Sequence, residues 1–420
     1  SNSIGSLRFL GAIDWREFVE TQSIVEKTLG EDPAGIYGTM DFATRDRYRH
    51  VVEQMAKRSP LSEVELARKA LALAQESVAR NGGADLTAHV GFYLIDKGRT
   101  QLERSAEVSV SLAESLRKAS SRFPLLLYGG GILLLTALFA GGLAAKAQAN
   151  GLQGWTLALV ALLSFLCASH LAVALVNWLA TLLATPRLLP RMDFSKGIPQ
   201  ELRTLVVVPT LLTSGPGIKA LAKALEVRFL ANRELHLHFS LLTDFRDADE
   251  ETQPGDKPLL RLAQRHIEEL NEKYPSTSGD NFYLFHRPRR YNPQDQLWMG
   301  HERKRGKLGD LNALLRGEAP DAFALVVGDV SVLSGVKYVI TLDSDTQLAR
   351  DSARQFVGAM AHPLNRPRYD EAGQRVVGGY GILQPRVVAT LSGTNRSRYA
   401  RMCASEIGID PYTRAVSDVY

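Results

Sequence analysis

The chain contains little cysteine, and that scarcity excludes cross-linked and zinc-built folds. Its two cysteines among 420 residues, Cys167 and Cys403, provide neither a disulfide framework nor the paired spacing of a zinc site. A strong charge of one sign is also missing, because 50 basic and 45 acidic residues leave a net charge of only +5. This balance does not indicate a nucleic-acid partner, and we expect none. The first residues lack the pattern of a secretory signal peptide.

Two long stretches lack charged side chains altogether. Residues 123–145 and 151–185 contain no Asp, Glu, Lys or Arg. Each exceeds the roughly 20 residues that a helix needs to cross a bilayer, so two transmembrane helices with a short external turn are predicted over 123–185. Basic residues flank the pair on both sides: Arg117, Lys118, Arg122, Arg187, Arg191 and Lys196. The turn carries only Lys146, so the positive-inside rule predicts that both flanks are cytosolic.

The region before the spans, residues 1–122, is predicted to be all-α and cytosolic. Ser62 and Glu65 form a capping-box pattern ahead of a helix over 64–79, and glycines from Gly82 end it. The apolar run at 89–95 instead predicts a short strand or extended segment. A catalytic role can be imagined for its His89, but a structural role is expected.

From residue 202 onward, strand and helix patterns alternate. Apolar runs predict buried strands over 203–210, 235–242, 282–285 and 337–342, and helical patterns cover 218–231, 261–273, 308–316 and 352–360. This alternation predicts a doubly wound α/β domain, with a largely parallel sheet flanked by helices, over 186–420.

The most informative motif follows the last of these strands. Residues 341–348 are Thr-Leu-Asp-Ser-Asp-Thr-Gln-Leu, so Asp343 and Asp345 stand one residue apart at the strand's carboxyl end. Carboxylates at this spacing can share a divalent cation that also holds substrate phosphates. Open α/β sheets bind nucleotides at this edge, so the motif predicts a metal-assisted site for a nucleotide diphosphate.

Two further features point to the same ligand. Asp244 follows the second strand, where a carboxylate can accept hydrogen bonds from a base or a ribose, although an acidic surface loop is an equally good interpretation. The basic stretch at 301–307 ends in Gly306-Lys307 at a helix start, where backbone amides favour phosphate. A solvated basic loop or a contact with anionic lipid remains an alternative for that stretch.

Together these motifs resemble the processive inverting glycosyltransferases of the GT-A fold. The features concerned are Pro209-Thr210, Asp244, Gly306-Lys307 and Asp343-Ser344-Asp345. Longer stretches, at 89–99, 204–212, 341–348, 379–386 and 407–414, are similar to cyclic β-1,2-glucan synthases, so the resemblance covers nearly the whole chain.

This resemblance implies a UDP-glucose donor, a Mg2+ or Mn2+ cofactor, and a protein-linked β-1,2-glucan that is elongated with inversion and then cyclised in the bacterial inner membrane. On the donor side it implies roles for Thr210 and Lys307, for Asp244 at the uridine, and for Asp343 at the ribose and diphosphate. Asp345, with Asp343, would ligate the metal.

On the acceptor side the resemblance implies roles for Gln384 and Arg386. Synthases of this type also carry a catalytic base and a Gln-x-x-Arg-Trp motif well after the paired aspartates, and that motif does not occur in these 420 residues. We therefore expect the base beyond Tyr420, in the remainder of a larger polypeptide, and assign none here.

A protein-linked glucan also needs a nucleophilic side chain on a cytosolic segment that can reach the site. The Pro- and Arg-rich stretch at 287–295 is aperiodic and directly precedes the Gly-Lys loop. Tyr291 is the candidate priming residue, and a loop tyrosine packing on a neighbour is its alternative.

Three other functions share parts of this pattern. A phosphatase of the haloacid-dehalogenase type also uses Asp-x-Asp after a strand, but it needs Thr or Val where this chain has Gln347. A membrane-anchored module that binds UDP-sugars without turnover fits the missing base. A synthase of the cellulose or hyaluronan type shares the sheet and the aspartates, and only the resemblance argues against it.

Overall fold

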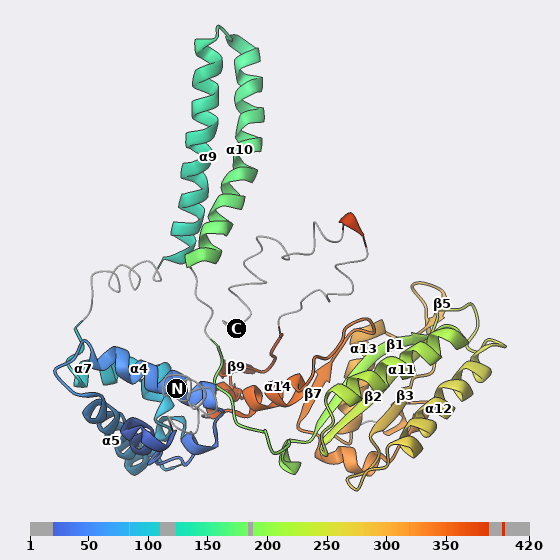
Figure 1. Cartoon of the computed structure of the whole chain (residues 1–420). Helices are drawn as coiled ribbons and strands as arrows, with labels where there is room; N and C mark the ends of the chain where they lie inside the picture. The colour runs from blue at the N-terminus through green and yellow to red at the C-terminus, as the bar shows by residue number, and fades with distance from the viewer. Residues whose placement is uncertain are drawn as a thin grey trace, which may run out of the picture. The chain divides into compact units, whose positions relative to one another are not determined.

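The computed structural model describes residues 20–83, 85–109, 123–183, 188–318, 320–385 and 397–399. The chain divides into two compact units (Figure 1). The first unit comprises residues 1–38, 45–190 and 366–420, and the second comprises 39–44 and 191–365.

The described part of 20–109 is built from helices, as expected. They are α3 (Ile24–Leu29), η1 (Tyr37–Thr39), α4 (Phe42–Ala56), α5 (Glu63–Asn81), η2 (Leu86–Ala88), α6 (Gly91–Ile95) and α7 (Arg99–Ser105). The predicted capping box is confirmed, because the Ser62 hydroxyl accepts from the Glu65 amide and the Glu65 carboxylate accepts from the Ser62 amide. Helix α5 ends at the Gly82 cap, also as predicted.

The extended segment predicted at 89–95 is wrong for residues 91–95, which form the single-turn helix α6, whereas His89 has extended backbone. Short apolar runs have no diagnostic periodicity, so local contacts decide their conformation. Here the buried Asp32 carboxylate accepts from the Val90 amide at 2.9 Å and contacts the His89 ring nitrogen Nδ1 at 2.8 Å. Nε2 of the same ring lies 3.2 Å from the buried Tyr48 hydroxyl. These bonds give His89 the structural role that was expected.

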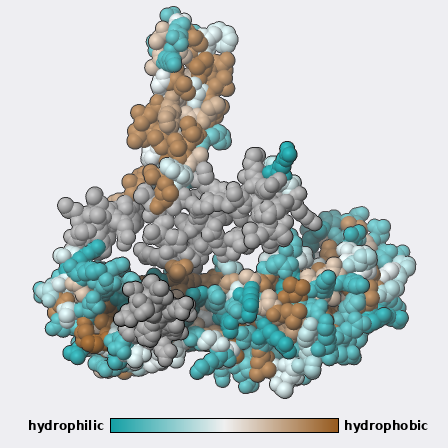
Figure 2. Space-filling view, viewed as in Figure 1, coloured by the Kyte–Doolittle hydropathy of each residue, from teal (hydrophilic) through white to brown (hydrophobic). Residues whose placement is uncertain are grey.

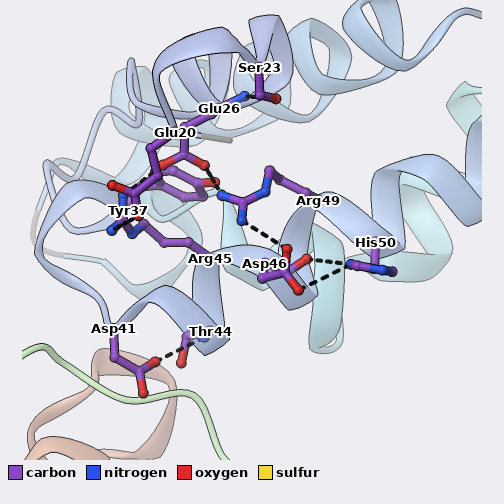
Figure 3. A network of polar contacts seen from close by, with 10 residues as sticks. All are labelled: Glu20, Ser23, Glu26, Tyr37, Asp41, Thr44, Arg45, Asp46, Arg49 and His50. Carbon is purple, nitrogen blue, oxygen red and sulfur yellow. Dashed lines mark hydrogen bonds and ion pairs between the residues drawn. The ribbon is translucent and has the colours of Figure 1, made fainter. Parts of the chain in front are cut away.

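A second buried polar network joins α3, η1 and α4 (Figure 3). The Glu26 carboxylate accepts from the Tyr37 hydroxyl at 2.6 Å and from Arg45 at 2.7 Å, and it also pairs with Arg49. Burial first, and then the hydrogen bond to Glu26, raise the pKa of Tyr37 above its ordinary range. The three elements are thus fixed by charge-assisted bonds rather than by apolar packing alone.

Both uncharged stretches form long helices, α9 (Pro124–Ala149) and α10 (Gly154–Leu183), which pack against each other as a hairpin. By length and composition each can cross a membrane. Their large apolar side chains are mostly exposed, and Figure 2 shows the hairpin as a largely brown column. The Tyr128 hydroxyl of α9 donates a hydrogen bond to Asn177 Oδ1 of α10 at 2.8 Å.

The first unit also contains a short hairpin that the sequence did not predict. It consists of β8 (Arg368–Asp370) and β9 (Arg375–Gly378), paired antiparallel.

The second unit, residues 39–44 and 191–365, has the predicted α/β fold with a mostly parallel sheet; the domain was expected over 186–420, and residues 366–420 group with the first unit. Its five-stranded sheet has the order β6-β3-β2-β1-β7. Strands β1 (Thr204–Leu212), β2 (Leu237–Phe245), β3 (Phe282–His286) and β7 (Tyr338–Thr341) are parallel, and the edge strand β6 (Leu325–Val327), which was not predicted, is antiparallel. The remaining elements are η3 (Gln200–Leu202), α11 (Gly215–Ala231), α12 (Asp256–Lys273), β4 (Arg290–Asn292), β5 (Leu297–Met299), α13 (Arg303–Leu315), η4 (Pro320–Ala322), η5 (Val330–Gly335), α14 (Ser352–Ala361) and η6 (Pro363–Asn365).

Helices cover both faces of this sheet. Along β1, Val206 and Val208 join a core with residues of α11, α12 and α14, whereas Leu205 and Val207 face a second core with residues of α13, η4 and η5. Because both faces are buried, β1 begins with a continuous apolar run rather than an alternating one, and all nine residues of β2 are buried, its polar ones included.

Candidate functional site

The carboxyl ends of the four parallel strands meet at one edge of the sheet. The register pairs Thr210 of β1 with Thr243 of β2, and Leu211 with Asp244. Strand β3 ends immediately before Arg287, and β7 ends two residues before Asp343. The residues that the sequence singled out on separate strands therefore share this edge, where α/β sheets bind ligands.

Three of the predicted donor-side residues are in direct contact. The Lys307 ammonium of α13 lies 2.9 Å from Asp244 Oδ2 and donates to the Thr210 carbonyl at 2.7 Å. Both charged side chains are buried, with Asp244 at 2% and Lys307 at 3% exposure. Burial lowers the pKa of Lys307, and the adjacent Asp244 only partly opposes this. Lys307 thus ties the end of β1 to the end of β2.

Sequence reasoning missed the partner that completes this cluster, Arg287. Its guanidinium donates two hydrogen bonds to Asp244, from Nε to Oδ1 at 2.9 Å and from Nη2 to Oδ2 at 3.1 Å. Nη1 donates a third to Asp310 at 2.7 Å. Burial opposes the charge on Arg287, but the hydrogen bonds to Asp244 and Asp310 raise its pKa overall. An arginine directly after a buried parallel strand was the available signal.

Glycines make room for this cluster. A Cβ at Gly300 would lie 2.5 Å from Asp244 Oδ2, and one at Gly306 would meet the His301 carbonyl and approach Arg287. Since Asp244 already holds two cations, a ligand that reached its oxygens would have to displace one of them. Its role toward uridine stays a prediction.

An open cleft of about 360 Å3 lies at the same edge. Its lining is mainly polar and includes Thr213, Arg246, Asp247, Asp256 and Arg289. Arg289 pairs with Asp256 and lies with its guanidinium carbon 4.9 Å from the centre of the Phe245 ring. A volume of this size suits a small polar ligand.

The predicted basic helix start lies close to these residues. Helix α13 begins at Arg303, five residues earlier than predicted, so Lys304 and Arg305 fall in its first turn and are exposed. The N-cap residue Glu302 makes no side-chain cap. The Arg303 amide donates to the Gly300 carbonyl at 3.0 Å, so at this helix N-terminus the positive end of the helix dipole and the exposed basic side chains are what favour an anion.

The paired aspartates stand in an exposed loop after β7. The Asp343 carboxylate, 62% exposed, pairs with Lys304 of α13. Among the described residues, no group of three or more His, Cys, Asp or Glu could hold a metal ion. The two carboxylates nevertheless fit Mg2+ or Mn2+, because such ions use one or two carboxylates together with water and phosphate.

The remaining candidates are Tyr291, Gln384 and Arg386. The aperiodic segment predicted at 287–295 is wrong in part, since Tyr291 belongs to the hairpin β4–β5. Its ring packs on Trp298, with ring centres 5.7 Å apart, and its side chain is half exposed. Cross-strand pairing explains the difference, because aromatic pairs stabilise short hairpins that have little periodicity. Gln384 is exposed and belongs to the first unit, and Arg386 and residues 407–414 lie outside the described residues.

Fold and site define a mixed α/β protein with a charged site at the carboxyl edge of a mostly parallel sheet, in a chain that also contains two long apolar helices. No protein-family model matches the chain. It is 38% identical, over 423 aligned residues and its whole length, to the cyclic β-(1,2)-glucan synthase NdvB of Rhizobium meliloti (strain 1021). The chain spans 15% of the length of that relative. The resemblance that the motifs indicate is therefore confirmed for the whole chain.

Proposed function

We propose that this segment binds the sugar donor of a membrane-bound glycosyltransferase. The activity is transfer of glucose from UDP-glucose to a growing, protein-linked β-1,2-glucan, with inversion, leading to a cyclic product. The observation that carries the proposal is the 38% identity to a cyclic β-(1,2)-glucan synthase along the whole chain. A GT-A-like arrangement of the second unit is part of the same proposal.

The charge distribution at the sheet edge supports a nucleotide diphosphate as ligand. The exposed Lys304 and the N-terminus of α13 provide positive potential for phosphates. The cleft beside Arg246 and Arg289 offers polar groups for a base and a ribose. The buried cluster of Asp244, Arg287 and Lys307 keeps the strand ends rigid beneath the ligand.

In this proposal Asp343 and Asp345 hold Mg2+ or Mn2+ at the diphosphate. When bound, such an ion neutralises charge on the leaving UDP. Lys304 then exchanges its bond with Asp343 for phosphate oxygens, and the amides of α13 orient the same group. We assign no catalytic base.

The remaining roles are proposed from the resemblance and from the hairpin. Gln384 and Arg386 serve the acceptor glucan, and Tyr291 carries the first sugar. Helices α9 and α10 span the bacterial inner membrane with both flanks in the cytosol, where UDP-glucose is available.

Calorimetric titration of UDP-glucose into the detergent-purified chain, with and without Mg2+, tests the proposal. We expect Mg2+-dependent binding that Asp345→Ala loses by at least about tenfold. Glu318→Ala is the matched control, because Glu318 is another exposed carboxylate paired with an exposed base, Arg316, beyond the C-terminal end of α13. Equal binding with and without the metal, or by Asp345→Ala and the wild type, would contradict it. UDP-glucose binding without turnover in the longest form of the protein would favour a binding module instead.

A further inference from the structure

A buried arginine lies beneath the loop that carries the paired aspartates. Arg228, near the end of α11, is fully buried at 0% exposure. Its guanidinium binds backbone carbonyls of that loop: Nε donates to Thr346 at 3.0 Å, and Nη2 donates to Ser344 and Thr346 at 2.7 Å each. A longer contact of 3.4 Å reaches the Asp343 carbonyl.

Arg228 has a different set of partners from the other buried arginines in the second unit. Arg287 and Arg289 each pair with an aspartate, whereas no carboxylate among the described residues forms an ion pair with Arg228. Its Nη1 also has no hydrogen-bond partner in that part of the chain. Burying a guanidinium without a directly bonded carboxylate is costly, and the carbonyl bonds, together with the nearby charge of Asp345, offset that cost.

The same face of α11 holds the far end of the loop. Asn232, one helical turn after Arg228, donates from Nδ2 to the Ala349 carbonyl at 3.0 Å and accepts from the Ala353 amide at 3.0 Å. The Asp351 amide also donates to the Ala231 carbonyl. Residues 343–353 are therefore tied to the end of α11 at both ends of the loop.

We infer that Arg228 is the positioning residue of the Asp343–Asp345 pair. By drawing the carbonyls of residues 344 and 346 inward, its planar guanidinium fixes the backbone on each side of Asp345. The exposed Asp343 and Asp345 side chains are then held ready for a divalent cation at the carboxyl edge of the sheet. The inference rests on the proposed function for the identity of the bound ion.

Geometry, rather than charge alone, is what this role needs. A guanidinium offers several donors in one plane, whereas a lysine ammonium is a single point charge on a flexible stem. Arg228→Lys preserves the positive charge and removes the planar set of donors, and Arg228→Met removes both. If the planar guanidinium fixes the conformation of the 343–346 loop, both variants must bind the cation more weakly, and lysine must not restore the affinity.

The test measures Mn2+ binding to the full chain in detergent by electron paramagnetic resonance, with Mn2+ as the only ligand. We expect at least about tenfold weaker binding by Arg228→Lys and Arg228→Met. The matched control is Arg49→Lys, another buried arginine changed in the same way in the first unit, with unchanged Mn2+ binding expected. Uridine binding, followed by saturation-transfer NMR, needs no cation and should survive in Arg228→Lys, which separates loop positioning from loss of fold.

Three results would overturn the inference: wild-type Mn2+ affinity in folded Arg228→Lys, equal weakening in Arg49→Lys, or no Mn2+ binding by the wild type. If Arg228→Lys does not fold, Asn232→Ala decides, because it loosens the other end of the loop and leaves the buried charge in place; unchanged Mn2+ affinity there contradicts the inference. If instead the proposed function is wrong, the wild type would bind Mn2+ but not UDP-glucose, and this result is distinct from those that overturn the inference.

Discussion

The Lys307 ammonium lies 2.9 Å from Asp244 Oδ2, and this buried ion pair joins helix α13 to the end of strand β2. Three positions earlier on the same helix, Lys304 pairs with Asp343 at the exposed surface. Two lysines one turn apart thus bind two aspartates of the site, and the Lys307–Asp244 pair is buried whereas the Lys304–Asp343 pair is exposed. Because of this difference in burial, substitutions of the two lysines should separate a contribution to folding stability, from Lys307, from a contribution to ligand binding, from Lys304.

Lys307→Met is expected to destabilise the second unit by about 2 kcal/mol. The variant removes a charge-assisted bond to Asp244 and leaves the Thr210 carbonyl without its donor. Lys304→Met is the matched control and should cost at most about 1 kcal/mol, because exposed pairs contribute little. Unfolding of the detergent-purified variants gives both values. Equal losses in the two variants would show that burial of the Lys307 pair does not matter.

Stability should fall as the pH drops from about 6.5 to 4, and the buried His286 is the reason. Burial lowers the pKa of His286 from 6.5 to about 4, so below pH 6.5 the unfolded chain binds a proton that the folded chain refuses. The stabilisation is complete above pH 6.5, and about 3 kcal/mol of it is lost by pH 4. Thermal unfolding across this range checks the slope.

His286→Gln should flatten that part of the pH dependence. His50→Gln, in the first unit, replaces an exposed histidine and should leave it unchanged. A slope that persists in His286→Gln would assign the effect to other groups.

The strands of the sheet could be predicted from the sequence more completely than the contacts at the carboxyl edge of the sheet. The strands β1, β2, β3 and β7 were predictable because each is a short apolar-rich run that alternates along the chain with a helical pattern. Thr210, Asp244 and Asp343 lie where those runs end. Arg228 was not predictable, because it is distant in sequence from the loop it binds and looks like an ordinary surface residue of a helix. Its role depends on a tertiary contact.

The hairpins and the turn at 89–95 were unpredictable for a different reason. Strands of three or four residues, such as β4 and β8, are too short to show a period, and only their cross-strand partners reveal them. The run at 89–95 is helical because the Asp32 carboxylate binds its first residues. Such long-range polar bonds leave no local pattern.

That carboxylate gives a prediction for the first unit. Burial alone would raise the pKa of Asp32, but bonds from the His89 ring and from the Val90 and Ile36 amides lower it overall. Its contribution to stability is therefore present above the ordinary pKa of about 3.8 and is lost as the pH falls further. Asp32→Ala should destabilise this unit by about 3 kcal/mol or more, because it leaves several buried donors unpaired.

Hydrogen exchange at residues 85–95 measures that loss. Asp85→Ala is a suitable control, since Asp85 is an exposed aspartate that caps η2 nearby. Similar protection at 85–95 in Asp32→Ala and the wild type would mean that the buried network does not hold this segment.

Tyr291→Phe tests whether this tyrosine carries the first sugar of the glucan. The substitution keeps the ring that packs on Trp298 and removes only the hydroxyl, which has no hydrogen-bond partner among the described residues, so stability should change by less than about 0.5 kcal/mol. We expect intact-protein mass spectrometry, on the longest form of the protein that contains this segment, to show no glucan adduct after incubation with UDP-glucose and Mg2+. Tyr369→Phe, which alters an exposed tyrosine of the β8–β9 hairpin, should still carry the adduct. A glucan that remains covalently attached to Tyr291→Phe would exclude Tyr291 as the priming residue, because no other oxygen of that side chain remains to bear the glycosidic bond.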